Sequence, residues 1–210
     1  PLNPTSYFKV ITWYKGSGAG PQAMIAWLSK LGKGYTIQQG ADLISEAYET
    51  YCGGILGLPP ANSATVSFSG SPWCFYRVIQ TNDNIRTKNA VGYVRLDCPR
   101  GGLVFATMNV LPLGQPAVAS NIFGNQLPIG TRVMYYDHNM QAYVTDNKSF
   151  SGWSSSINFA LGRGFWIQVP SSASSNMYSV YLVGEVPGSA TVPSITCEVA
   201  TGSTMLGYPY

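Results

Sequence analysis

Charged residues are scarce in this chain of 210 residues. Asp, Glu, Lys and Arg make up 10% of the sequence, against roughly 25% in ordinary soluble domains. A soluble monomer normally uses charged side chains to keep its surface hydrated. Together with 14 Tyr, 5 Trp and 8 Phe, the low charge favours a protein whose surface is largely covered by copies of itself. A monomeric secreted β protein rich in Ser, Thr, Tyr and Gly is the alternative.

The chain also lacks the concentrated positive charge that nucleic-acid binding requires. The formal net charge is +3, and the 12 Lys and Arg residues are spread along the sequence without a basic run that contains aromatic residues. Neutralising phosphates requires such a basic patch, so we expect no nucleic-acid partner. A viral coat subunit is a minor alternative, although the chain shows no basic arm.

Residues that carry out catalysis are equally rare. His138 is the only histidine and lies in a YYDHNMQ turn, and no serine lies in a GxSxG elbow. Asp137 next to His138 cannot orient the imidazole as a triad carboxylate would. The cysteines form no CxxC and no group with histidine, so the spacing of metal ligands is absent. We therefore predict no enzyme, no catalytic residue, no cofactor and no metal site.

Cys52, Cys74, Cys98 and Cys197 allow three disulfide pairings, and the sequence alone does not choose between them. We favour Cys52–Cys74 because both residues lie in the N-terminal half. The composition as a whole predicts an oxidising compartment outside the cell, where such pairs persist. Four buried free thiols in a reducing cell are the alternative.

Long apolar runs are missing as well. None reaches the approximately 18 residues that a membrane-spanning helix needs, so we expect no membrane span. The chain begins at Pro1 without Met, which suggests a leader that is removed and therefore an extracellular or cell-surface protein. The alternative is a chain that merely begins where its ordered part begins.

The N-terminal part, residues 1–80, is predicted to form a small α+β unit. Apolar residues at helical spacing predict two helices, one in residues 21–31 and one in residues 40–54. Strands are expected at residues 6–14, and at 65–69 and 73–80, which would form a hairpin. Residues 81–90 are polar and small, so we predict a linker there.

From residue 91 onward the pattern changes to strands and turns. Apolar and polar residues alternate in short runs, and Gly, Pro, Asn, Asp or Ser interrupt them, which is typical of antiparallel hairpins. Val118 to Ile122 are expected to form a short helical turn. The predicted fold class is mainly β, with an antiparallel β-sandwich or partly open barrel after the α+β unit. Its strands are predicted at residues 91–98, 102–111, 131–136, 141–146, 164–169 and 178–186.

Several motifs in this part are similar to those of a known module. The chain reads GYVRLDCPRGGLVFATMNVL, then LPIGTRVMYYDHNMQAYV, then a lone Trp153, then LGRGFWIQVP and VYLVGEVP. It resembles a β-rich module of predicted secreted and surface proteins of environmental bacteria. The resemblance covers residues 91–187 and implies no known chemistry. It does imply a lead strand, a hairpin and a closing strand in that order.

Such modules often recur in tandem, and residues 195–210 resemble a second lead strand with no module after it. The resemblance places Cys197 where Cys98 lies in the first lead strand, so it implies a Cys98–Cys197 disulfide. Residues 188–210 are thus predicted to be a C-terminal strand that can pair with a neighbouring subunit. Its predicted assembly residues are Ile195, Cys197, Val199, Met205, Leu206 and Tyr208.

Two functional predictions follow. The first is a structural subunit of an extracellular filament, appendage or surface layer that assembles non-covalently with copies of itself. The second is a secreted carbohydrate-binding or adhesive module, because aromatic rings offer flat apolar faces with polar edges on which sugars stack. The candidate stacking residues are Trp73, Trp153, Trp166, Tyr135 and Tyr136. Of these, we expect Trp153 and Trp166 to lie in the core.

Overall fold

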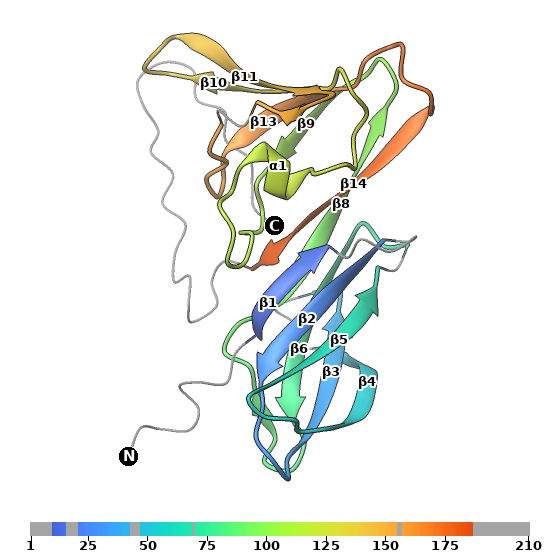
Figure 1. The fold of residues 1–210 in the computed structure, drawn as a ribbon, viewed down its shortest axis with the longest axis vertical. Helices are drawn as coiled ribbons and strands as arrows, with labels where there is room; N and C mark the ends of the chain where they lie inside the picture. Colours follow the sequence, from blue (N-terminus) through green and yellow to red (C-terminus); the bar gives the residue numbers. More distant parts are fainter. Residues whose placement is uncertain (1–9, 16–20, 43–46, 69, 155–156, 187–210) are drawn as a thin grey trace. The chain divides into compact units, whose positions relative to one another are not determined.

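The described part of the protein is mainly β and is built from several antiparallel sheets with one short helix (Figure 1). The chain divides into two compact units, which are described separately. Unit 1 comprises residues 1–94 and 183–194, and unit 2 comprises residues 95–182 and 195–210. This computed structural model describes residues 10–15, 21–42, 47–68, 70–154 and 157–186.

The described residues of unit 1 contain seven complete strands. A three-stranded sheet has the order β1-β2-β5, and a second sheet has the order β14-β8-β6-β3-β4, with β7 paired to β6. The long strands β8 (Val91–Pro99) and β14 (Met177–Glu185) contribute residues to both units. The strands wholly within unit 1 are β1 (Val10–Lys15), β2 (Gln22–Leu28), β3 (Gly34–Gly40), β4 (Glu49–Leu56), β5 (Ala61–Ser67), β6 (Trp73–Gln80) and β7 (Ile85–Arg86).

The two helices predicted in residues 21–31 and 40–54 are wrong, because the described residues of both segments form strands and turns. In β2, Ala23, Ile25 and Trp27 are fully buried, whereas Gln22 and Met24 are half-buried and Leu28 is exposed, so the strand alternates apart from the small, buried Ala26. The apolar residues that fit a helical spacing in this segment therefore belong to the two opposite faces of a strand. In β4 the Gly53-Gly54 pair lies inside the strand, where Gly54 has φ 71°, rather than at a helix end.

The predicted hairpin of residues 65–69 and 73–80 is also wrong. β5 pairs with β2, whereas β6 pairs with β3, β7 and β8. The two sheets are joined through side chains instead. The Tyr76 hydroxyl donates to the Ser67 carbonyl at 3.4 Å, and the Tyr51 hydroxyl accepts from the Ser67 amide at 2.9 Å. Two runs of strand character that are close in sequence thus lie in different layers of the same unit.

The predicted linker, residues 81–90, lies within unit 1. It contains β7, and its Asn89 side chain binds β1. The Asn89 amide oxygen accepts from the Val10 amide at 2.8 Å, and the amide nitrogen donates to the Val10 carbonyl at 3.0 Å. One buried side chain therefore satisfies both backbone groups of Val10.

Unit 2 is built on a five-stranded sheet of order β12-β11-β10-β13-β9. No strand order in the described part of the chain closes into a barrel. The strands predicted from residue 91 onward are confirmed, with shifts of a few residues at their ends, and the helical turn near residue 120 is confirmed as α1. The elements are β9 (Leu103–Thr107), α1 (Ala119–Ile122), β10 (Arg132–Asp137), β11 (Ala142–Ser149), β12 (Gly152–Trp153) and β13 (Gly164–Gln168).

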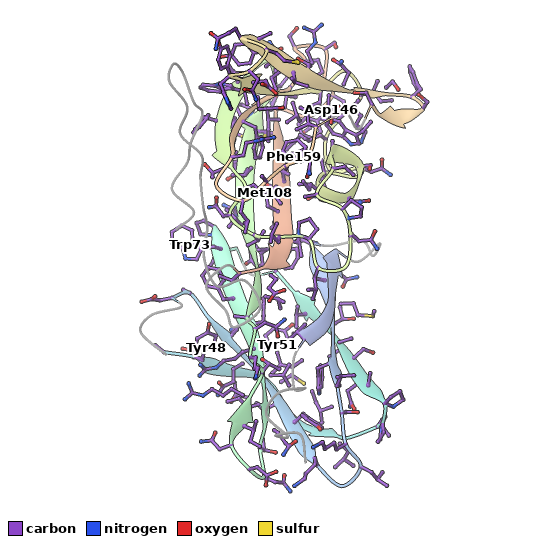
Figure 2. The ribbon with its side chains drawn as sticks, turned by 90° about the vertical axis from the view of Figure 1, so that its left-hand side faces the viewer. Tyr48, Tyr51, Trp73, Met108, Asp146 and Phe159 are labelled. Atoms are coloured by element: carbon purple, nitrogen blue, oxygen red, sulfur yellow. The ribbon has the colours of Figure 1, made fainter. Side chains whose placement is uncertain are left out.

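An aromatic core lies against one side of this sheet, the side on which Figure 1 shows α1. Phe159 meets Phe123 with ring centroids 5.6 Å apart and Phe165 with centroids 5.1 Å apart, both edge to face. Met108 is fully buried in the same cluster, and both Met108 and Phe159 are labelled in Figure 2. The four-residue α1, the only helix in the described ranges, is far too short and polar to span a membrane.

We expect Phe159→Ala to lower the free energy of unfolding by about 3–5 kcal/mol, because it leaves a cavity among three packed rings. Phe150→Ala is the matched control, since Phe150 is 95% exposed and should change stability by no more than about 0.5 kcal/mol. Urea unfolding followed by tryptophan fluorescence measures both. Equal effects from the two variants would contradict the assignment of this core.

Candidate functional site

The five-stranded sheet of unit 2 has two unlike faces. Side chains alternate across a strand, so Phe165 and Ile167 of β13 point into the core, and Trp166 between them points the other way. The same alternation holds in β9 and β10. We call the side away from the core the outer face. Its apolar residues are Leu103, Phe105, Met134, Tyr136, Tyr143 and Trp166.

Strand register places these residues in three rows across the sheet. In the middle row, Trp166 lies opposite Phe105 on one neighbour and Met134 on the other. Tyr136 lies opposite Tyr143 in the next row. The remaining row is polar at three of its four positions, and its residues are Asn147, Arg132, Gln168 and Leu103.

The outer face is apolar and accessible, and its aromatic rings are tilted relative to one another. Leu103, Phe105 and Tyr143 are about half exposed, and apolar patches of a few hundred Å² are often functional. The rings of Phe105 and Trp166 lie 5.0 Å apart at 60°, and those of Tyr136 and Tyr143 lie 5.4 Å apart at 73°. Each pair can therefore present only one ring flat to a ligand.

The opposite side of β11 carries two buried charges. The Lys148 ammonium donates to the carbonyls of Gly124 and Leu127 at 2.9 and 2.8 Å, and to the Asn125 side chain at 3.3 Å. Burial lowers the pKa of Lys148. Asp146, labelled in Figure 2, accepts from the Ser154 hydroxyl and from the amide of Ile157, both at 3.1 Å. Both groups fasten loops to the sheet, which is a structural role.

The turn that holds the single histidine is likewise a structural turn. The Asp137 carboxylate accepts from the amides of Asn139 and Met140 at 2.9 and 3.2 Å and from the Tyr135 hydroxyl at 2.9 Å. The Tyr135 hydroxyl bond and these amides hold the pKa of Asp137 below its usual value. His138 takes part through its carbonyl, which accepts from the Gln141 side chain. The carboxylate is thus engaged with its own turn.

The structure separates the candidate stacking residues. Trp153 packs on Phe123 with ring centroids 5.5 Å apart and donates its indole N–H to the Gly124 carbonyl at 2.9 Å, so it joins the core, as expected. Trp166 was also expected in the core, but it lies half-buried on the outer face. The alternation across β13 sends it there, since its neighbours Phe165 and Ile167 take the core positions.

The other three candidates lie in three different places. Tyr135 packs against the core beneath the Arg163 guanidinium, 4.4 Å from the ring centroid. Tyr136 lies on the outer face. Trp73 lies in unit 1, about half exposed, with its indole N–H donated to the Ala41 carbonyl at 2.9 Å (Figure 2).

Sequence reasoning missed four members of the outer face. They come from strands whose odd and even positions are both apolar, as in GLVFATM, so alternation alone did not show which side is exposed. The register between strands, which brings Phe105 beside Trp166, was the missing information. The four missed residues are Leu103, Phe105, Met134 and Tyr143.

The predicted Cys52–Cys74 disulfide is not present, because both residues carry free thiols. Cys52 in β4 lies opposite Ile37 of β3, which in turn lies opposite Val78 of β6. Cys52 and Cys74 are therefore on strands two spacings apart, about 9–10 Å. A disulfide requires Cα atoms within about 7 Å.

The second predicted pair, Cys98–Cys197, is not present either, because Cys98 is not bonded to another cysteine. Cys98 carries a free thiol buried in the core of unit 2, while Cys197 lies outside the described residues. All the predicted assembly residues, from Ile195 to Tyr208, also lie outside them.

The comparisons with known proteins give no relative. No protein-family model matches the chain, and no curated protein or solved structure matches it either. The resemblance to a bacterial surface module is therefore still a prediction. Within the part of the chain that the structure describes, no group of three or more His, Cys, Asp or Glu side chains could hold a metal ion. The outer face is the best candidate site.

The three described cysteines should differ sharply in reactivity. Burial raises the pKa of Cys98 to about 11 and also raises that of Cys74, so at pH 8 few of these thiols are reactive thiolates. Cys52 is exposed. We expect iodoacetamide to alkylate Cys52 in the native protein, and Cys74 and Cys98 only after unfolding.

Peptide mass spectrometry after short labelling at pH 8 measures the three sites. Labelling in denaturant is the control, because all three thiols are then accessible to iodoacetamide and should be alkylated to a similar extent. A native Cys52 that resists alkylation, or a Cys52–Cys74 linked peptide, would contradict the arrangement of strands in unit 1.

Proposed function

We propose that this chain is a structural subunit that assembles non-covalently with copies of itself. The observation that carries the proposal is the outer face of unit 2, an exposed apolar surface on a protein with very little charge. Aromatic residues and Met are enriched at protein interfaces, and charged residues are depleted at their centres. The outer face has this composition, with Arg132 as the charged side chain of its three rows.

A second copy of the same face is a suitable partner. A two-fold axis along the middle row would set the polar row of one copy over the tyrosine row of the other. Arg132 would then face Tyr136 or Tyr143, an attractive cation–π arrangement, and the two Arg132 charges would stay apart. The tilted rings would interdigitate rather than lie flat. Self-pairing of this kind is isologous and closes on itself.

The size of the outer face limits what it can do alone. Four strands about 4.8 Å apart and five residues of about 3.4 Å each give a footprint of roughly 300 Å². A standard interface buries about 800 Å² on each partner. The face therefore supports a weak pairing, and an extended polymer needs a second contact on each subunit.

Strand donation by residues 195–210 is our proposal for that second contact. An added strand pairs its backbone with an open sheet edge, and β4 and β9 each end their sheet. A head-to-tail contact of this kind need not close, so it would extend paired subunits into a filament, appendage or surface layer. The extracellular location rests on composition, because the described cysteines are free thiols.

The assembly proposal predicts that Phe105→Ser with Tyr143→Ser shifts the protein toward monomer, with self-association weakened about tenfold or more, because two apolar contacts become polar. Phe150→Ser is the matched control, since Phe150 is highly exposed but lies outside the three rows. Sedimentation velocity over a concentration series measures the effect. Unchanged association in the double variant, or an equal loss in the control, would show that copies of the chain do not associate through the outer face.

Deletion of residues 195–210 tests the second contact separately. We expect pairs to persist, because the outer face is intact, while extended polymers disappear from negative-stain micrographs. Polymers of unchanged length would reject strand donation and leave the pairing result standing.

Carbohydrate binding is the alternative function for the same surface, and the exposed aromatic rings favour it. The inter-ring angles of 60° and 73° count against stacking on a long flat polysaccharide. Glycan-array binding that is lost in Tyr143→Ser and kept in Phe150→Ser would support it over self-assembly.

A further inference from the structure

One end of unit 1 exposes a cluster of leucines, which we call the leucine tip. It is formed by the turn between β2 and β3 and the turn between β4 and β5. Soluble surfaces normally carry apolar side chains singly, so four exposed leucines on two joined turns and the strand ends that lead into them need a reason. The exposed fractions are 81% for Leu31, 76% for Leu56, 67% for Leu58 and 36% for Leu28.

The two turns are fastened to each other through their backbones. The Gly57 amide donates to the Lys33 carbonyl at 2.8 Å, and the Ser29 amide donates to the Pro60 carbonyl at 3.1 Å. The approach is so close that a Cβ on Gly57 would lie 1.9 Å from the Lys30 carbonyl oxygen. The tip is therefore one firmly held surface rather than two independent loops.

The Asn62 side chain fixes the second turn from within. Its oxygen accepts from the Leu58 amide, and its nitrogen donates to the Leu56 carbonyl, both at 2.7 Å. These bonds satisfy the backbone on both sides of Gly57 and hold Leu56 and Leu58 in their exposed positions. The backbone that carries Leu56 and Leu58 cannot move without breaking these bonds.

The charge around the tip is slightly positive. Lys30 and Lys33 belong to the first turn, and Lys33 forms a 2.9 Å ion pair with Asp83 from the adjacent turn between β6 and β7. Lys33 and, more weakly, Lys30 lower the pKa of Asp83. Two lysines against one carboxylate leave an excess positive charge beside the leucines.

We propose that the leucine tip binds the surface of a lipid bilayer. Separate aliphatic side chains on turns suit a fluid apolar phase, which needs no matching shape. The leucines would enter the boundary between headgroups and acyl chains, and Lys30 and Lys33 would face anionic headgroups, as in other interfacial membrane contacts. Through this contact unit 1 would hold the protein at a membrane surface.

A second copy of the chain is a poorer partner for the tip. The outer face of unit 2 contains no acidic residue in its three rows to meet the lysines. Two tips facing each other would bring Lys30 and Lys33 of both copies together. Charge therefore favours an anionic lipid surface over self-association at this site.

Vesicle co-sedimentation of the full chain tests the proposal. We expect binding to phosphatidylcholine vesicles that contain phosphatidylserine, weaker binding to phosphatidylcholine alone, and partial loss in high salt. Leu31→Ser and Leu58→Ser should each lower the partition coefficient about tenfold. Lys30→Glu should remove the preference for phosphatidylserine and leave most binding to neutral vesicles.

Phe150→Ser and Met177→Ser are the controls, because both residues are exposed and belong to unit 2. They should keep full binding. Absence of sedimentation with either vesicle, or equal losses in the controls, would overturn the proposal. A change in sedimentation velocity without vesicles in Leu31→Ser would assign the tip to a protein interface instead. Unfolding curves of all variants should coincide, because none of these side chains is buried.

Discussion

The packing of one side of the five-stranded sheet, through Phe165 of β13, against the rings of Phe123 and Phe159 is the constraint on which unit 2 depends. Once that side is committed to the core, the two-residue period of each strand decides where every other side chain points. Trp166 lies on the outer face because Phe165 takes the core position. The composition of the outer face is therefore a direct consequence of the core.

Unit 1 is held together by a different set of contacts. Its two sheets are joined by ring contacts such as Trp27 with Tyr35, whose centroids lie 6.0 Å apart, and by tyrosine hydroxyls that reach the opposite backbone at Ser67. Its turns are held by single polar side chains, of which Asn62 is one. With few charges available, the fold relies on neutral hydrogen bonds and aromatic packing.

The sequence was sufficient for the strands after residue 91, because polar turns separate short alternating runs there. It failed for residues 21–31, where Met24 and Leu28 on one face and Ile25 and Trp27 on the other also fit a helical spacing. The sequence also did not predict which strand pairs with β5 or which side chains form the outer face. Strand pairing depends on contacts between distant residues, such as Phe105 and Trp166, which a local pattern does not contain.

The amide of Asn89 has a consequence for how sheets of this protein can grow. It occupies both hydrogen-bonding groups of Val10 on the free side of β1, in the place where an incoming strand would begin to pair. A strand that pairs with β1 at Val10 must first displace this buried side chain. The edge strand of the neighbouring sheet, β4, carries Gly53 and Gly54 near its middle. Strand addition to the three-stranded sheet is thus hindered at the start of β1, whereas β5 forms the other edge of that sheet and β4 forms an edge of its neighbour.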